Sequence, residues 1–217
     1  MEALIFDFDG VIADSEPVHE RAITRVAQML GVPFTHEDYM TRIIGLDDRD
    51  TFRVIAEMGG LLLVPERLAE IVSTKQSFVL EMIDQGEVKA FPGTIRLIRE
   101  SARALPIAVC SGAARIEIER ILERFELLDL FGHIVTADDV EQAKPDPAGY
   151  RMTAEKLGVA PASCVTIEDT PTGLTAAKNA GLKVVGVCHS VSAAEMSQAD
   201  LVVESSEQIT MDMLRSV

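Results

Sequence analysis

Residues 3–10 read ALIFDFDG, an apolar run that ends in two aspartates and a glycine. The run Ala3–Phe8 predicts a first strand that is buried on both faces, as the strands of parallel sheets are. In open α/β sheets, ligands bind beyond the carboxyl ends of the strands. Asp7, Asp9 and Gly10 stand at that end, so this stretch predicts both the type of sheet and the place where its chemistry lies.

Similar apolar runs return from Val88 to the C-terminus, with helical stretches between them. The predicted strands are Ile107–Cys110, His133–Thr136, Cys164–Ile167, Val184–Val187 and Leu201–Val203. The predicted helices are Thr94–Arg103, Arg115–Phe125, Pro147–Leu157 and Thr172–Ala180. This alternation predicts an α/β fold: a doubly wound, Rossmann-like parallel sheet with helices on both faces.

The segment between the first strand and Val88 contains no convincing strand. Apolar residues recur at helical spacing after Pro17, with Ser15 as the expected N-cap and Gly31 near the end. Further helices are expected over His36–Ile44, Asp48–Met58 and Pro65–Asp84. We therefore predict two domains: a catalytic core of residues 1–15 and 88–217, and an all-helical cap of residues 16–87 inserted after the first strand.

The charge of the chain limits its partners. Its 217 residues include 20 Lys and Arg and 35 Asp and Glu, which gives a formal charge of −15. An acidic surface repels polyphosphate and anionic lipid, so neither nucleic acid nor a membrane is an expected partner. An acidic protein that handles phosphate must build a local positive site, from a cation and one or two basic residues.

Three cysteines lie in or beside apolar runs: Cys110, Cys164 and Cys188. Their number and wide spacing match neither a zinc pattern nor a disulfide framework. We expect small, buried, reduced side chains. No signal peptide or membrane-spanning stretch is visible, and a cytoplasmic monomer is expected.

Three further strand ends carry polar side chains: Ser111-Gly112, Lys144-Pro145-Asp146 and Glu168-Asp169-Thr170. Together with the first strand they would bring the four carboxylates of Asp7, Asp9, Glu168 and Asp169 to one edge of the sheet. Acids this close need a positive charge between them. Mg²⁺ prefers carboxylate and water oxygens and accepts a phosphate oxygen. We therefore expect Mg²⁺ as the cofactor, held by Asp7, Asp9, Glu168 and Asp169, with Asp7 and Asp169 as the best direct ligands.

The pattern suits phosphoryl transfer to a side-chain carboxylate. Asp7 would attack phosphorus and form an aspartyl-phosphate. Asp9 would protonate the leaving alcohol and then take a proton from the incoming water. Because the two aspartates alternate along an extended segment, their side chains would face the same way. The phosphate would be held by one charge and several hydrogen-bond donors: Lys144, Ser111 and the backbone of Gly112 and Ala113.

These residues resemble the haloacid dehalogenase superfamily, specifically its phosphatases with a helical cap after the first motif. The matching pieces are Asp7-Phe8-Asp9-Gly10-Val11 with Asp14-Ser15, Val109-Cys110-Ser111, Lys144-Pro145-Asp146 and Ile167-Glu168-Asp169-Thr170-Pro171-Thr172-Gly173. The resemblance covers essentially the whole chain, in order. It implies a magnesium-dependent phosphoric monoester hydrolase for a small phosphorylated metabolite, with a sugar phosphate favoured. The dehalogenase and phosphonatase branches lack the second aspartate, so Asp9 implies phosphate esters.

Within that superfamily the chain is similar to β-phosphoglucomutase and to sugar-phosphate phosphatases. His19 falls where the mutase has a histidine that contacts its acid/base aspartate. Two departures favour hydrolysis. The mutase has a lysine before the glycine of its substrate loop, where this chain has Ile44 before Gly45, and a lysine shortly after the motif serine, where this chain has only Arg115. A mutase remains the alternative, with Arg49 or Arg115 as the cation for a second phosphate.

The cap would close over the sheet edge and select the substrate. Its candidate inward-facing residues are Glu16, His19, Gly45, Asp47, Asp48 and Arg49. For Asp47 and Asp48 a solvated charged loop is an equal alternative.

A non-enzymatic receiver module, with its own phosphorylated aspartate, is the alternative from another class. Receivers are shorter and carry adjacent acids on their first strand, whereas Phe8 separates the acids here. The residues do not identify the metabolite itself.

Overall fold

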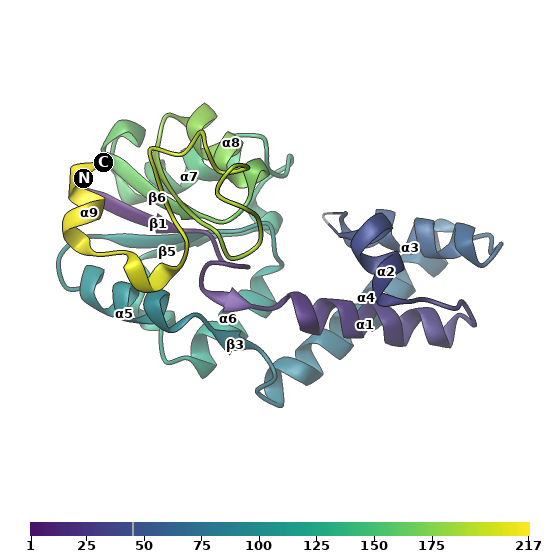
Figure 1. Cartoon of the computed structure of the whole chain (residues 1–217). Helices are drawn as coiled ribbons and strands as arrows, with labels where there is room; N and C mark the ends of the chain where they lie inside the picture. The colour runs from purple at the N-terminus through teal and green to yellow at the C-terminus, as the bar shows by residue number, and fades with distance from the viewer. Residues whose placement is uncertain (45) are drawn as a thin grey trace. The chain divides into compact units, whose positions relative to one another are not determined.

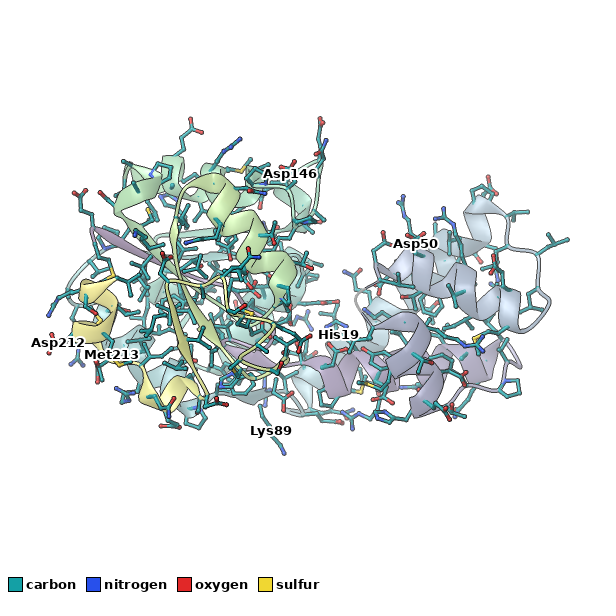
Figure 2. All side chains as sticks on the ribbon, turned by 45° about the horizontal axis from the view of Figure 1, so that its top comes forward. His19, Asp50, Lys89, Asp146, Asp212 and Met213 are labelled. Carbon is teal, nitrogen blue, oxygen red and sulfur yellow. The ribbon has the colours of Figure 1, made fainter. Side chains whose placement is uncertain are left out.

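Two units make up the structure, a computed structural model that describes residues 1–44 and 46–217 (Figure 1). Met1–Asp14 and Lys89–Val217 form the first, which we call the sheet unit, and Ser15–Val88 form the second, the helical unit. Figure 2 adds the side chains and labels Lys89, where the chain returns to the sheet unit.

Six parallel strands form the sheet, in the order β5-β4-β1-β6-β7-β8. Their bounds are β1 Ala3–Phe6, β4 Ile107–Cys110, β5 His133–Val135, β6 Cys164–Glu168, β7 Lys183–Val187 and β8 Leu201–Val203. Every residue of β1 is fully buried, as its apolar sequence requires. The chain passes from β1 to β4 and β5 on one side of β1 and then from β5 to β6 on its other side, so the edge beyond β1 is the switch point where ligands bind in such sheets. The predicted fold class is confirmed.

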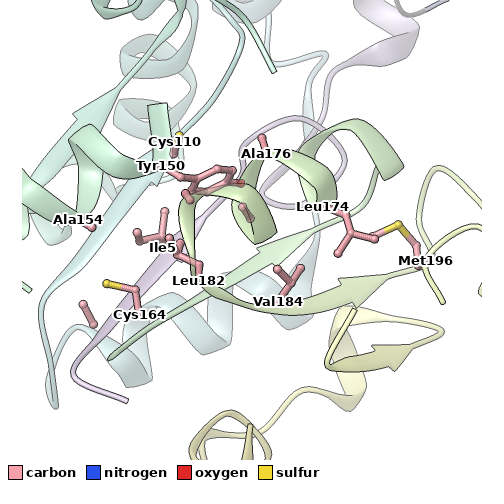
Figure 3. Close-up of a cluster of buried hydrophobic side chains, with 13 residues drawn as sticks. Ile5, Cys110, Tyr150, Ala154, Cys164, Leu174, Ala176, Leu182, Val184 and Met196 are labelled. Carbon is pink, nitrogen blue, oxygen red and sulfur yellow. The ribbon is translucent and has the colours of Figure 1, made fainter. Parts of the chain in front are cut away.

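Five helices belong to the sheet unit: α5 Pro92–Ser101, α6 Arg115–Arg124, α7 Ala148–Leu157, α8 Pro171–Ala180 and α9 Met211–Ser216. Small and aliphatic side chains of α7 and α8 pack on one face of the sheet against Ile5, Cys164 and Val184 (Figure 3). Cys110 and Cys164 are buried as expected, but Cys188 is partly exposed because it follows β7 in a loop.

The helical unit contains α1 Glu16–Met29, α2 His36–Asp38, α3 Asp48–Met58 and α4 Pro65–Asp84. Aromatic and branched side chains, with Phe52 and Ile55 fully buried, form its core. The expected helix over His36–Ile44 divides instead into α2 and a π-helical turn, Tyr39–Ile43. Ser15 stands at the N-cap position of α1, but its side chain makes no capping hydrogen bond.

A two-stranded ribbon was not expected from the sequence. β2, Ala13–Asp14, pairs antiparallel with β3, Lys89–Ala90, at the points where the chain leaves and re-enters the sheet unit. The amide of Phe91 extends this pairing by donating to the carbonyl of Ile12 at 3.1 Å.

Within the described residues, no helix is both long enough and apolar enough to cross a membrane.

The core of the helical unit generates a prediction about stability. Phe52→Ala should lower the free energy of unfolding by about 3–5 kcal/mol, because it leaves a cavity among buried side chains. Leu62→Ala is the matched control, since Leu62 is 100% exposed, and should change that free energy by less than about 0.5 kcal/mol. Urea unfolding followed by circular dichroism measures both. Equal effects of the two substitutions would contradict this packing.

Candidate active site

Asp7 and Glu168 lie side by side because the strands that carry them are neighbours. β1 pairs with β6 in a register that places Phe6 opposite Ile167, and the Asp7 amide donates to the Ile167 carbonyl at 3.0 Å. The next residue on each strand is therefore an acid at the same edge. Glu168 is fully buried and Asp7 nearly so.

Lys144 joins these two acids. Its Nζ donates to Asp7 Oδ1 and to Glu168 Oε1, each at 2.7 Å, and to the Cys110 carbonyl at 3.1 Å. Burial by itself would lower the pKa of Lys144, but the Asp7 and Glu168 carboxylates outweigh it and hold that pKa well above its ordinary value. The ammonium group is therefore a fixed positive charge.

Asp169 completes a cluster of three buried carboxylates around one lysine. Burial, and then the charge of Glu168, raises the pKa of Asp7 well above its ordinary value and raises that of Asp169 to about 7. One ammonium group cannot neutralise three ionised acids, so the fully ionised cluster lacks positive charge.

The cluster fits a divalent cation. Asp7, Glu168 and Asp169 each offer an oxygen, all within 4.8 Å of one another. Asp169 Oδ1 is buried and has no hydrogen-bond partner among the residues that the structure describes, while Asp169 Oδ2 accepts a hydrogen bond from the Ser190 hydroxyl. An unpartnered buried carboxylate oxygen beside two further carboxylates is the kind of donor set that Mg²⁺ takes.

Asp9 lies beyond the end of β1, in an isolated bridge with Ala13 where a turn begins. β1 ends at Phe6, and the Phe8 carbonyl accepts hydrogen bonds from the amides of Ile12 at 2.8 Å and Ala13 at 3.0 Å. The expected strand Ala3–Phe8 therefore ends two residues early, whereas the expectation that the Asp7 and Asp9 side chains face the same way stays a prediction. Asp9 is half-buried and near enough to help raise the pKa of Asp169, but it stands outside the three-carboxylate cluster.

Gly10 makes this turn possible. Its φ is +73°, in the left-handed region that glycine tolerates best. A Cβ atom there would lie 1.7 Å from Asp169 Oδ2, so only glycine lets the turn approach the acid.

Ser111 follows β4, the neighbour of β1, and reaches the same edge. Its side chain is nearly buried, and its Oγ accepts a hydrogen bond from the Ala113 amide at 3.0 Å. The loop through Gly112, where a Cβ would meet no atom within 4 Å, leads into α6.

Two residues of this site, Tyr150 and Ser190, are absent from the sequence-based expectations. Tyr150, on α7, donates its hydroxyl to Glu168 Oε1 at 2.5 Å. The sequence places it only within the predicted helix Pro147–Leu157, with no functional role. Ser190 follows β7, so the strand-end argument could have found it. Gly173, the last residue of the fourth matching piece, lies in the first turn of α8 beside Glu168, where a Cβ would lie 2.0 Å from the carboxylate.

The cap candidates make contacts inside the helical unit. His19 Nδ1 lies 2.9 Å from Nζ of the buried Lys75, which also pairs with Asp48 at 2.8 Å. Glu16 accepts a hydrogen bond from the Tyr39 hydroxyl. Asp47 accepts from the Asp50 amide at 2.8 Å and so caps α3.

Gly45 lies outside the described residues. Arg49 is exposed and, with Arg53, lines a cavity of about 260 Å³ in the helical unit. Arg115, the other candidate cation, is held by Asp139 at 2.6 Å and by the Ile134 carbonyl at 3.0 Å.

Comparisons with known proteins were made on sequence and on structure. A family model described as haloacid dehalogenase-like hydrolase matches residues 4–187. The phosphorylated carbohydrates phosphatase of Thermotoga maritima is 32% identical over 194 residues, which cover 88% of each chain. The β-phosphoglucomutase of Bacillus subtilis is 30% identical over 218 residues, covering 99% of this chain and 94% of that protein. CbbY from Rhodobacter sphaeroides, solved in complex with phosphate, superposes with a TM-score of 0.88 at 27% identity, covering 99% of each chain.

His19 generates a prediction about pH. Burial, and then the nearby charge of Lys75, lowers its pKa to about 3, so the folded chain holds this histidine neutral. The unfolded chain therefore binds this proton more readily than the folded chain does. The stability that depends on a neutral His19 is fully present above the ordinary pKa of about 6.5 and is lost as the pH falls toward 3. His19→Asn keeps an acceptor for Lys75 but cannot titrate. Urea midpoints between pH 7 and 4 should therefore fall less steeply in this variant.

The control for this experiment is His133→Asn, since His133 is exposed on β5 in the sheet unit. This variant should keep the wild-type pH dependence. A His19→Asn profile that matches the wild type would show that His19 does not contribute to acid sensitivity.

Proposed function

Because the chain belongs to the haloacid dehalogenase-like hydrolase family, we propose that it is a magnesium-dependent phosphatase acting on a small phosphorylated metabolite, through an aspartyl-phosphate on Asp7. One observation carries the proposal: Lys144 binds Asp7 and Glu168 through the same ammonium group, beside an Asp169 oxygen that lacks a partner. This arrangement suits a nucleophile held in place next to a cation site.

Asp7 performs the first step. A carboxylate oxygen attacks phosphorus, and the bond from phosphorus to the alcohol oxygen breaks. Water then attacks the same phosphorus, the bond to Asp7 breaks and inorganic phosphate leaves. Mg²⁺ bound by Asp7, Glu168 and Asp169 would supply positive charge at the phosphoryl oxygens and let these buried acids ionise together.

The other residues of the edge assist both steps. Asp9 gives a proton to the leaving alcohol and takes one from the attacking water. Lys144 neutralises charge on the transferring group, and the Ser111 hydroxyl donates a hydrogen bond to it, with the backbone of Gly112 and Ala113 beside it. The helical unit acts as the cap that selects the substrate, with Glu16, His19, Gly45 and Arg49 as its candidate contacts.

A sugar phosphate is the substrate class that we favour. Support comes from the Thermotoga maritima relative, whose name states phosphorylated carbohydrates. Hydrolysis is favoured over a mutase reaction because a mutase must hold a second phosphate with cations. Of the two candidate cations, Arg115 is engaged by Asp139 and the Ile134 carbonyl, and Arg49 is exposed in the helical unit. The two lysines of the mutase are absent from the matching positions of this sequence.

The nucleophile generates the first functional prediction. Asp7→Asn should lower phosphate release from a panel of sugar phosphates by about 1,000-fold or more, because an amide cannot replace the attacking carboxylate. Asp212→Asn is the control, since Asp212 lies on α9 with a side chain 93% exposed (Figure 2). Wild-type turnover in Asp7→Asn would refute the mechanism. An isomerised sugar phosphate with little free phosphate would identify a mutase.

The acid cluster generates a second prediction, which does not depend on turnover. Asp169→Asn removes one of the mutually repelling acids, so at pH 8 in EDTA it should unfold at the same temperature as the wild type or higher. Mg²⁺ should then stabilise only the wild type, by about 2.7 kcal/mol at a hundred times its dissociation constant. Thermal unfolding with and without Mg²⁺, at constant ionic strength, measures both effects. Equal stabilisation of both proteins would place the metal elsewhere.

A further inference from the structure

The loop after β7 touches the candidate site at two points. β7 is the neighbour of β6, with Gly186 opposite Glu168, so the chain that follows β7 passes the end of β6. The consecutive residues His189 and Ser190 each send a hydrogen bond to a different part of the site. Neither residue has a role in the proposed mechanism.

Ser190 orients the Asp169 carboxylate through a hydrogen bond. Its hydroxyl donates to Oδ2, and Oδ1 is left buried without a partner. Because a carboxylate is planar, fixing Oδ2 also fixes the direction of Oδ1. The oxygen that remains free is then the one available to the acid cluster.

His189 is held by three contacts and holds the turn that carries Asp9. The Ser206 amide donates to His189 Nε2 at 3.2 Å, so the ring proton is on Nδ1, which lies 2.7 Å from the Gly10 carbonyl and donates to it. The ring also stacks on Phe91, with centroids 4.0 Å apart and planes 12° apart.

The Gly10 carbonyl is an effective point at which to hold this turn. Gly10 follows Asp9 directly, has a left-handed conformation and lies against Asp169. Its carbonyl belongs to the peptide group that joins Gly10 to Val11, so a hydrogen bond to it fixes the turn one residue after Asp9.

We propose that His189 and Ser190 are positioning residues, His189 for the turn that carries Asp9 and Ser190 for the free oxygen of Asp169. This inference rests on the proposed function, which assigns the acid/base step to Asp9 and metal binding to Asp169. Supporting residues of this kind change activity or metal affinity by 10–100-fold when they are removed.

Two substitutions separate the two hydrogen bonds of His189. His189→Asn places an amide N–H near the position of Nδ1 and keeps the donor to Gly10, whereas His189→Gln places an oxygen near Nε2 and keeps the acceptor for Ser206. We expect His189→Ala and His189→Gln to lower kcat by 10–100-fold with little change in KM. His189→Asn should recover kcat to within about threefold of the wild type. Recovery by Gln and not by Asn, or a wild-type kcat in His189→Ala, would overturn the role of His189.

Hydrogen–deuterium exchange tests His189 without any substrate. The amides of residues 10–13 are bonded within the turn and should exchange about tenfold faster in His189→Ala, while those of β6 keep the wild-type rate. Unchanged exchange in the turn, or equal acceleration in β6, would contradict a local positioning role.

Magnesium titration by calorimetry tests Ser190. Ser190→Ala should weaken Mg²⁺ binding by 10–100-fold and Ser190→Thr should retain it. Ser192→Ala is the control, since the Ser192 hydroxyl bonds Glu195 at 2.7 Å in the same loop. Wild-type affinity in Ser190→Ala, or no Mg²⁺ binding by the wild type, would overturn the role of Ser190. A wild type that releases no phosphate would refute the proposed function alone, because exchange and titration would still decide the two positioning roles.

Discussion

One ammonium group shared by two buried acids is the contact on which the candidate site depends. Lys144 can bind Asp7 and Glu168 together only because β1 and β6 pair in a register that places the two acids side by side. Asp169 adds a third carboxylate, and the balance of charge then requires a further cation. Strand pairing places these acids at one edge of the sheet, and their burial and charge make the same edge the place where a cation would bind.

Much of the fold could be predicted because each strand of the sheet is a short apolar run between helical patterns. The parallel sheet, the family and the expectation of a hydrolytic enzyme are confirmed. The β2–β3 ribbon could not be predicted, since two residues per strand leave no periodicity. The end of β1 was also placed two residues late, because Phe8 is apolar and buried although it lies in a turn.

The proximity of Asp7, Glu168, Asp169 and Lys144 followed from reading the ends of strands. Side chains that act through tertiary hydrogen bonds left no such signal. Tyr150 occupies a core position of α7 and still reaches Glu168 with its hydroxyl. His189 follows the end of β7, as Ser190 does, but its partners, Gly10 and Ser206, lie 179 and 17 residues away. Sequence spacing contains no information about such partners.

The β2–β3 ribbon brings together the two ends of the helical unit. Paired antiparallel residues lie about 5 Å apart, so the chain leaves the sheet unit and returns to it at almost the same place. Any inserted segment whose two ends are equally close could therefore be grafted between Asp14 and Lys89 without a change in strand order. The helical unit could in this way be replaced as a whole while the residues of the candidate site keep their places in the sheet unit.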